Sequence, residues 1–279
     1  MMMDSVLEPV EGIQAYQRLC TLLDDSRSPL EIIHAQLSNM PVAAARIVSA
    51  ANLPIHSGAM PIDRLDRAVI LLGRETVGEL CRGMSEMATE ESDIAGFDLK
   101  NLVRHHVVVS RAAELVAHAA RLPLAQEARA AALFHDLGIF VQLRSQPDEF
   151  RLACTEARTT RSRLTEHEGL LCERDHCDAG AGLIADWGLP ESLVRAVEFH
   201  HDPLSAPNRH RYLAILIYAA ECLAKRAGFA DLFGDDALQL EHRILEELRL
   251  DDLILRAHVP VLRRMVADAD QCMALEPVS

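Results

Sequence analysis

The chain has 279 residues, enough for one large domain or two modest ones with hydrophobic cores of their own. With 49% apolar and 25% charged residues, it has the composition of a folded globular protein and not of a disordered chain. Its net charge of -14 argues against a nucleic-acid binder, because phosphate binding needs concentrated positive potential. No stretch is long and apolar enough to span a bilayer, and residues 1–11 lack a signal-peptide core. We therefore expect a cytoplasmic protein, without membrane partners, whose seven cysteines are reduced thiols.

The first third of the sequence predicts four helices. Residues 28–31 (Ser-Pro-Leu-Glu) match a capping box with proline at the first helical position, which predicts a helix start. Similar signals predict that Asn39 and Pro41 open the second helix and that Asp63 caps the third, which ends at Gly73. The fourth is expected over residues 75–88.

The remaining two thirds of the sequence are helical in pattern as well. Apolar residues recur with helical spacing over residues 99–120, 124–135, 147–157, 164–173, 177–187, 191–200, 212–227, 236–248 and 260–269. No segment alternates β-branched and polar residues for long, so strand content should be very low. The sequence therefore predicts an all-α fold.

Three segments are expected along the chain. The acidic, capping-rich residues 89–93, before Gly96, form the predicted internal boundary. It divides an N-terminal helical subdomain, residues 1–95, from a second helical subdomain, residues 96–230. The acidic extension at residues 231–279 has amphipathic patterns, which usually complete a protein's own core; partner binding is the less frequent role.

Histidine and acid residues recur across successive helices of the second subdomain. The set is His105, His135, Asp136, His176, His200, His201 and Glu221. Imidazole and carboxylate groups are ligands of Fe, Mn and Zn, and a helical bundle can hold such a site in its core. A metal there would activate water and neutralise a phosphate ester. Any one histidine alone is more often a packing residue or a polar helix end, so the order of the set carries the prediction of a metal site.

Other motifs with known chemistry are absent or incomplete. The sequence has no G-x-x-x-x-G-K-[ST] phosphate loop, no G-x-G-x-x-G dinucleotide motif and no G-x-S-x-G elbow. The pair His167-Glu168 lacks the second histidine of a zincin helix. Cys172 and Cys177 flank His176, but no second pair follows, which favours buried or incidental cysteines over a closed zinc site.

The ordered cluster resembles the HD superfamily of metal-dependent phosphohydrolases, and its HDOD branch in particular. The motifs that carry the resemblance are Asn52, residues 61–73 (PIDRLDRAVILLG), Arg104-His105, residues 131–138 (AALFHDLG), Asp175-His176, residues 187–190 (WGLP) and His200-His201. The resemblance covers roughly residues 10–230. It implies a multi-helix HD-like bundle with an N-terminal helical subdomain. It also implies that the seven clustered residues stand at the superfamily's metal-ligand positions, with Glu221 in place of an aspartate.

Two departures from the active relatives bear on function. Relatives that cleave cyclic di-GMP have a lysine just after the His-Asp-x-Gly stretch, where this chain has Ile139. They also have a Gly-Tyr-Pro motif after the paired histidines, where this chain has residues 203–205 (Pro-Leu-Ser). An aliphatic side chain offers no positive charge to a substrate phosphate. The resemblance therefore implies that cleavage of cyclic di-GMP is lost.

HDOD domains mostly serve as signalling outputs without demonstrated catalysis. The resemblance thus implies a stand-alone bacterial signal-transduction protein that binds a signalling protein partner and carries a vestigial or regulatory site for a divalent metal such as Fe, Mn or Zn. A nucleotide ligand and a homodimer both remain open. The alternative is a metal-dependent phosphohydrolase acting on a nucleotide or phosphodiester, in which Asp136 would be the catalytic residue.

Overall fold

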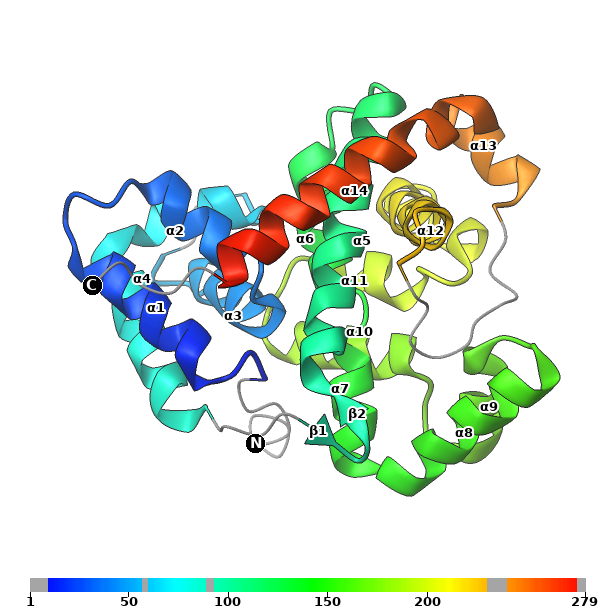
Figure 1. Ribbon diagram of the computed structural model, residues 1–279, viewed down its shortest axis with the longest axis horizontal. Helices are drawn as coiled ribbons and strands as arrows, with labels where there is room; N and C mark the ends of the chain where they lie inside the picture. Colours follow the sequence, from blue (N-terminus) through cyan, green and yellow to red (C-terminus); the bar gives the residue numbers. More distant parts are fainter. Residues whose placement is uncertain (1–9, 57–59, 89–92, 230–239, 275–279) are drawn as a thin grey trace.

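The computed structural model describes residues 10–56, 60–88, 93–229 and 240–274, with side chains as far as residue 270. The described part is all-α apart from one two-stranded hairpin, which confirms the predicted fold class (Figure 1). The elements are α1 (Ile13–Asp24), α2 (Leu30–Leu37), α3 (Pro41–Ala51), α4 (Leu65–Met87), β1 (Asp93–Ile94), β2 (Phe97–Asp98), α5 (Leu99–Ala119), α6 (Ala125–Phe134), α7 (Leu137–Ser145), α8 (Pro147–Thr160), α9 (Leu164–Leu171), α10 (His176–Asp186), α11 (Glu191–Glu198), η1 (Pro203–Ser205), α12 (Arg211–Arg226), α13 (His242–Leu248) and α14 (Asp252–Ala274).

The helices α1 to α4 pack together at the N-terminal end of the chain (Figure 1). The first of them, α1, was not predicted, although it buries Tyr16, Leu19 and Leu23 on one face at helical spacing. The predicted exit at Gly73 is a kink inside α4, where the backbone has φ 70° and ψ 170°. A positive φ is accessible to glycine without steric cost. The predicted third and fourth helices are therefore the two halves of one kinked helix.

The predicted side-chain caps at two helix starts were wrong. Helix α2 begins after Pro29 and lacks a side-chain cap, so residues 28–31 are not a capping box. Asp63 does not cap α4, whose N-cap residue is Arg64, whereas α3 begins at the predicted Pro41. The carboxylate of Asp63 instead accepts a hydrogen bond at 3.5 Å from Ser192 of α11. A tertiary contact has replaced the local one that the sequence pattern suggested.

The C-terminal end of α1 is held by a charged side chain from α4. The guanidinium of Arg74 donates to the backbone carbonyls of Leu22 at 2.9 Å, Leu23 at 3.1 Å, Asp25 at 3.0 Å and Ser28. The last carbonyls of a helix have no partner within the helix, so these bonds satisfy groups that are otherwise unpaired. Arg74 thereby fixes α1 against α4.

Replacing Arg74 with methionine is expected to lower the free energy of unfolding by about 2 kcal/mol, because charged hydrogen bonds to partly buried carbonyls are lost. Urea denaturation followed by circular dichroism measures the change. The matched control is Arg82→Met, which removes an exposed ion pair with Asp24 and should cost less than about 0.5 kcal/mol. Equal losses in the two variants would contradict the capping role of Arg74.

The helices α5, α6 and α12 form the centre of the second part, and α7, α10 and α11 pack beside them (Figure 1). Helix α5 starts where the sequence predicts, with the carboxylate of Asp98 accepting from the backbone N–H of Lys100 at 2.8 Å. Helix α7 was missed, because residues 137–143 are all buried and show no amphipathic period. This helix begins directly after Asp136, so it helps to place the acid of the His-Asp pair.

The hairpin of β1 and β2 lies at the predicted internal boundary. Its two turn residues, Ala95 and Gly96, have φ values of 54° and 85°, as a tight two-residue hairpin turn requires. Residues 89–92 of the predicted boundary lie outside the described residues. Residues on the two sides of the boundary contact each other. The Ser49 hydroxyl donates to the Trp187 carbonyl at 2.6 Å, and the guanidinium of Arg46 lies over the Trp187 ring. The division into segments at residues 95 and 230 stays a prediction.

Helix α14 lies across α5 and reaches toward the N-terminal helices (Figure 1). The prediction that this helix starts at Pro260 was wrong, because α14 begins at Asp252 and passes through the proline. A proline inside a helix removes a hydrogen bond but does not always end the helix. Arg104 of α5 holds α14 through a bidentate ion pair with Asp270, with the shorter contact at 2.9 Å. Of the predicted helix at 236–248, the first four residues lie outside the described part, and α13 covers His242–Leu248.

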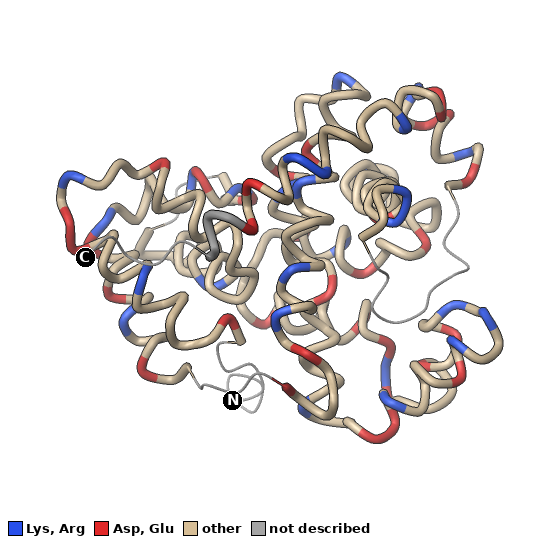
Figure 2. Tube along the Cα trace, viewed as in Figure 1, with Lys and Arg blue, Asp and Glu red and all other residues tan. Residues whose placement is uncertain are grey.

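Basic and acidic residues are interspersed along the helices, and neither sign dominates the trace in this view (Figure 2). Among the described residues, none of the helices combines the length and the low polarity that crossing a membrane requires.

Candidate metal centre

All seven predicted site residues lie together in the structure. They come from the helices around α5: His105 is in α5, His135 and Asp136 join α6 to α7, His176 is the first residue of α10, His200 and His201 follow α11, and Glu221 is in α12. Their ligand atoms, together with that of Cys177, fall into three overlapping groups in which the atoms lie within 4.8 Å of one another. The residues are buried, with His105 and His201 partly accessible.

Asp136 lies at the centre of the cluster and presents each carboxylate oxygen to a different pair of histidines. Its Oδ2 lies 3.4 Å from His105 Nε2 and 3.1 Å from His135 Nε2. Its Oδ1 lies 3.5 Å from His176 Nε2 and 3.3 Å from His200 Nε2. One carboxylate placed between two sets of imidazoles is an arrangement that can bridge two cations.

Three buried polar atoms of the cluster have no hydrogen-bond partner within the described part of the chain. They are His135 Nε2, Asp136 Oδ1 and Glu221 Oε2. The residues are nearly or fully buried, at 0%, 4% and 7% exposure respectively. Buried polar atoms without partners are costly, so their presence in one cluster indicates that an additional group binds there. Imidazole and carboxylate donors fit Fe, Mn or Zn.

Two of the clustered imidazoles, those of His135 and His200, are oriented by backbone carbonyls at helix ends. His135 and His200 each follow the last turn of a helix, and their Nδ1 atoms lie 2.8 Å from the Ala132 carbonyl and 2.6 Å from the Val197 carbonyl. A helix end leaves such carbonyls without partners, and each ring nitrogen supplies a donor. The Nε2 atoms of both rings face Asp136 and are the nitrogens that a metal ion would bind.

Glu168 of α9 is a member of the site that the sequence did not reveal. It is fully buried, and its Oε2 lies 2.6 Å from Nδ1 of His176. A carboxylate on the far nitrogen of an imidazole fixes the ring orientation and makes the other nitrogen a better ligand. The sequence carries no signal for this role, because the pair His167-Glu168 matches only an incomplete zincin motif.

Replacing Glu168 with glutamine is expected to weaken metal binding about 10- to 100-fold while the protein stays folded. The amide keeps the shape of the side chain but removes the charge that polarises His176. Titration of chelator-treated protein with Zn²⁺ or Mn²⁺ measures the affinity. The control is Glu166→Gln, in the first turn of the same helix and outside the three ligand groups; a loss as large in the control would contradict the positioning role.

Cys177 is buried beside the cluster, with its sulfur 3.6 Å from His176 Nε2 and 4.0 Å from His200 Nε2. Burial by itself raises the pKa of this thiol, but the charges of His176 and His200 more than offset it, and the pKa is lowered. Cys172 is not a member of any of the three groups. Cys177 thus places its sulfur among the possible ligand atoms, and the interpretation of the two cysteines as buried or incidental stays a prediction.

Burial and neighbouring charges shift the pKa values of the clustered residues in opposite directions. Burial would raise the pKa of Asp136, but the charge of His135 and the nearby imidazole of His105 hold it well below its usual range. Burial would lower the pKa of His135, and Asp136 raises it to about 9. Burial would raise the pKa of Glu221, and His201 and His135 bring it to about 2. The carboxylates of the site are therefore ionised, which is the form that binds a cation.

The neighbouring His106 has a packing role. It is buried, its ring stacks on Phe140 at 5.4 Å between centroids, and its Nδ1 lies 2.9 Å from the Leu133 carbonyl. Burial, followed by the charge of His135, lowers its pKa to about 3, so the ring is neutral. It therefore adds no charge to the site.

The structure is an all-α bundle in which two helices and several helix ends bring five histidines and two acids into one buried cluster, a candidate metal centre. The profile described as HDOD domain matches residues 13–203, more than half of the chain, and the chain therefore belongs to the HDOD family. A comparison with curated proteins gave no match.

Solved structures with the same fold come from several bacteria. The MmoQ response regulator of Methylococcus capsulatus str. Bath is 19% identical with a TM-score of 0.71, and the match covers 91% of this chain and 99% of that one. An HDOD domain protein of unknown function from Geobacter sulfurreducens is 21% identical, with a TM-score of 0.58 and coverage of 94% and 92%. A candidate phosphohydrolase of Shewanella amazonensis SB2B is 21% identical, with a TM-score of 0.53 and coverage of 94% and 93%. At these identities the likeness shows the fold.

Proposed function

We propose that this chain is a regulatory signal-transduction protein of the HDOD type that holds a divalent metal, Fe, Mn or Zn, in its histidine and acid cluster. The observation that carries the proposal is the set of three buried, unpaired atoms on His135, Asp136 and Glu221 within the described residues. A bound cation would supply partners to buried atoms of this kind. The name of the similar Methylococcus protein, MmoQ response regulator, agrees with a signalling role.

The surroundings of the cluster favour regulation over catalysis. When bound, the metal would supply Lewis acidity to water or a phosphate oxygen. Ile139, at the position where active relatives carry a lysine, is an apolar side chain that is 2% exposed and packs in the core. Pro203 opens a short 3-10 helix in place of the Gly-Tyr-Pro motif. The chain thus keeps the groups that would hold a metal and lacks the lysine and the Gly-Tyr-Pro motif of the active relatives.

The test is metal analysis of protein purified without chelator, followed by activity assays. We expect Fe, Mn or Zn in near-stoichiometric amounts and no hydrolysis of cyclic di-GMP or bis(p-nitrophenyl) phosphate. Metal-free wild-type protein that gains no thermal stability from any of the three ions would overturn the proposed metal site.

The second candidate is a metal-dependent phosphohydrolase acting on a nucleotide or phosphodiester. It is favoured by Asp136, which offers one oxygen to each of two histidine pairs, and by Arg163, whose Nη1 lies 3.5 Å from the His201 carbonyl. The guanidinium places a positive group at the edge of the cluster, where a phosphate would enter. Hydrolysis by the wild-type protein that disappears in both Asp136→Ala and Arg163→Gln would establish this function over the first.

We further propose that the signalling output is contact with a protein partner through the N-terminal helices. The α3–α4 connection and the first half of α4 expose several large apolar side chains, namely Leu53, Ile55, Met60, Ile70 and Leu71. Such side chains favour burial against a partner or a second copy of the chain. Ile70→Asp is expected to reduce signalling output in cells, whereas Leu170→Asp, at another exposed apolar site on α9, is the control. Sedimentation of both variants tests whether the partner is a second copy.

A further inference from the structure

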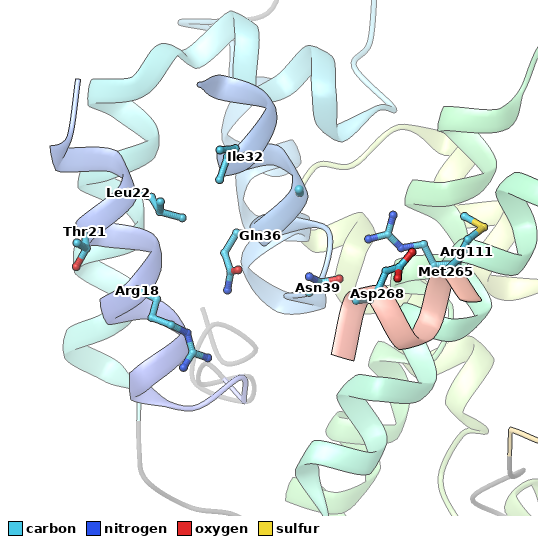
Figure 3. Close-up of a pocket in the computed structure, with 11 residues that line it drawn as sticks. Arg18, Thr21, Leu22, Ile32, Gln36, Asn39, Arg111, Met265 and Asp268 are labelled. Atoms are coloured by element: carbon cyan, nitrogen blue, oxygen red, sulfur yellow. The ribbon is translucent and has the colours of Figure 1, made fainter. Parts of the chain in front are cut away.

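A separate cavity lies between the N-terminal helices and α14, away from the histidine cluster (Figure 3). Its volume is about 440 Å³, within the range of pockets that bind small organic molecules. The walls come from α1, the segment from α2 to Asn39, α5 and α14. Five of the eleven lining residues are apolar, namely Leu22, Ile32, Ala35, Met265 and Ala269.

Two polar groups of the cavity are unsatisfied. Asn39 is only 4% exposed, and its Oδ1 is buried without a hydrogen-bond partner in the described part. Its side chain points into the space between α2 and α14 (Figure 3). The Nε of Arg18 is likewise buried and without a partner there. A buried acceptor and a buried cationic donor that lack partners in one apolar cavity indicate a ligand with a matching donor and anion.

The opposite side of the cavity carries one charge of each sign. Arg111 of α5 and Asp268 of α14 lie next to each other there (Figure 3). This pair of opposite charges favours neither a cationic nor an anionic ligand. The positive charge of Arg18 therefore indicates that the ligand is an anion. The lining residues include no aromatic side chain. Because nucleobases are commonly held by stacking on aromatic rings, the aliphatic walls favour an alkyl body over a base.

We propose that this cavity binds a small aliphatic organic anion, whose carboxylate or phosphate head pairs with Arg18 and whose hydroxyl or amide N–H donates to Asn39. The alkyl body lies against the aliphatic residues of α1, α2 and α14. Such a ligand contacts the N-terminal helices and α14 at the same time. Binding therefore ties the C-terminal helix to the N-terminal part of the chain, independently of the metal centre.

The test uses isothermal titration of the full chain with four probes: decanoate, decyl phosphate, 3-hydroxydecanoate and 10-hydroxydecanoate. We expect saturable binding of the alkyl anions, and decanoate against decyl phosphate shows which head is preferred. Arg18→Gln is expected to weaken binding at least 10-fold, whereas Arg27→Gln, whose side chain is 90% exposed, leaves it unchanged. Both variants should keep the wild-type metal content, which separates this result from the proposed function.

Asn39 is tested by the hydroxyl group of the probe. One of the two hydroxydecanoates is expected to bind at least 5-fold tighter than decanoate, and Asn39→Leu should abolish that preference while decanoate still binds. Amide hydrogen exchange in α14 should slow when ligand is added to the wild type. The proposal is overturned if no alkyl anion binds, or if Arg18→Gln binds the alkyl anions as tightly as wild type does.

Discussion

Replacing Asp136 with asparagine is expected to remove most of the bound metal from the protein. Each oxygen of this carboxylate faces a different histidine pair, at distances from 3.1 to 3.5 Å. The amide has the same shape but no charge, and one of its two ends becomes a donor that cannot bind a cation. Because Asp136 contacts both halves of the cluster, its loss affects both, which gives it a larger expected effect than any single histidine.

Elemental analysis of the purified variant measures this loss directly, and we expect metal content below about a tenth of the wild-type value. Thermal unfolding supplies a second measurement. Metal addition should raise the unfolding temperature of chelator-treated wild type, since a ligand that binds only the native state stabilises it. Asp136→Asn should abolish that rise.

The matched control is Asp178→Asn. Asp178 lies on α10, two residues after His176, but its side chain is exposed and it belongs to none of the three ligand groups. It should keep the wild-type metal content. If the Asp136 variant retains its metal, or if both variants lose it equally, the central role of this carboxylate is wrong.

The order of histidines and acids along the chain was sufficient to predict which residues meet. The pairs His135-Asp136 and His200-His201 stand at helix ends, and a sequence marks helix ends by its apolar period and by the residues that follow. The all-α class was predictable for the same reason, because long segments such as residues 99–120 have an uninterrupted helical period.

The residues around the ligands could not be predicted. Glu168 contacts His176 only because α9 and α10 pack together, and nothing in the local sequence encodes that approach. Helix α7 was missed because burial on all sides removes the amphipathic period. The cap at Asp63 was wrong because its carboxylate accepts a tertiary hydrogen bond from Ser192 instead. Local patterns therefore predict elements better than they predict contacts between elements.

The second large effect is expected from Gly138→Ala, which should lower the free energy of unfolding by at least about 3 kcal/mol. A Cβ at Gly138 would lie 1.9 Å from the carbonyl oxygen of His176 and 2.6 Å from the backbone nitrogen of Gly180. Both obstacles are backbone atoms, so no side chain can rotate away and helices α7 and α10 must separate. That separation moves His176 away from Asp136, so metal content should fall together with stability.

Two further glycines of α10 provide a graded comparison. Gly182→Ala meets only an arginine side-chain atom at 3.6 Å, so it should leave the protein unchanged or raise the free energy of unfolding by up to about 1 kcal/mol through helix propensity. In Gly180→Ala, the added Cβ would lie 3.0 Å from the backbone nitrogen of Gly138 and 3.2 Å from a valine methyl. Its effect on the free energy of unfolding should therefore lie between those of Gly138→Ala and Gly182→Ala. Urea denaturation of the three variants measures the order. If Gly138→Ala is no more destabilising than Gly182→Ala, the close approach of α7 and α10 does not hold the His-Asp pair against His176.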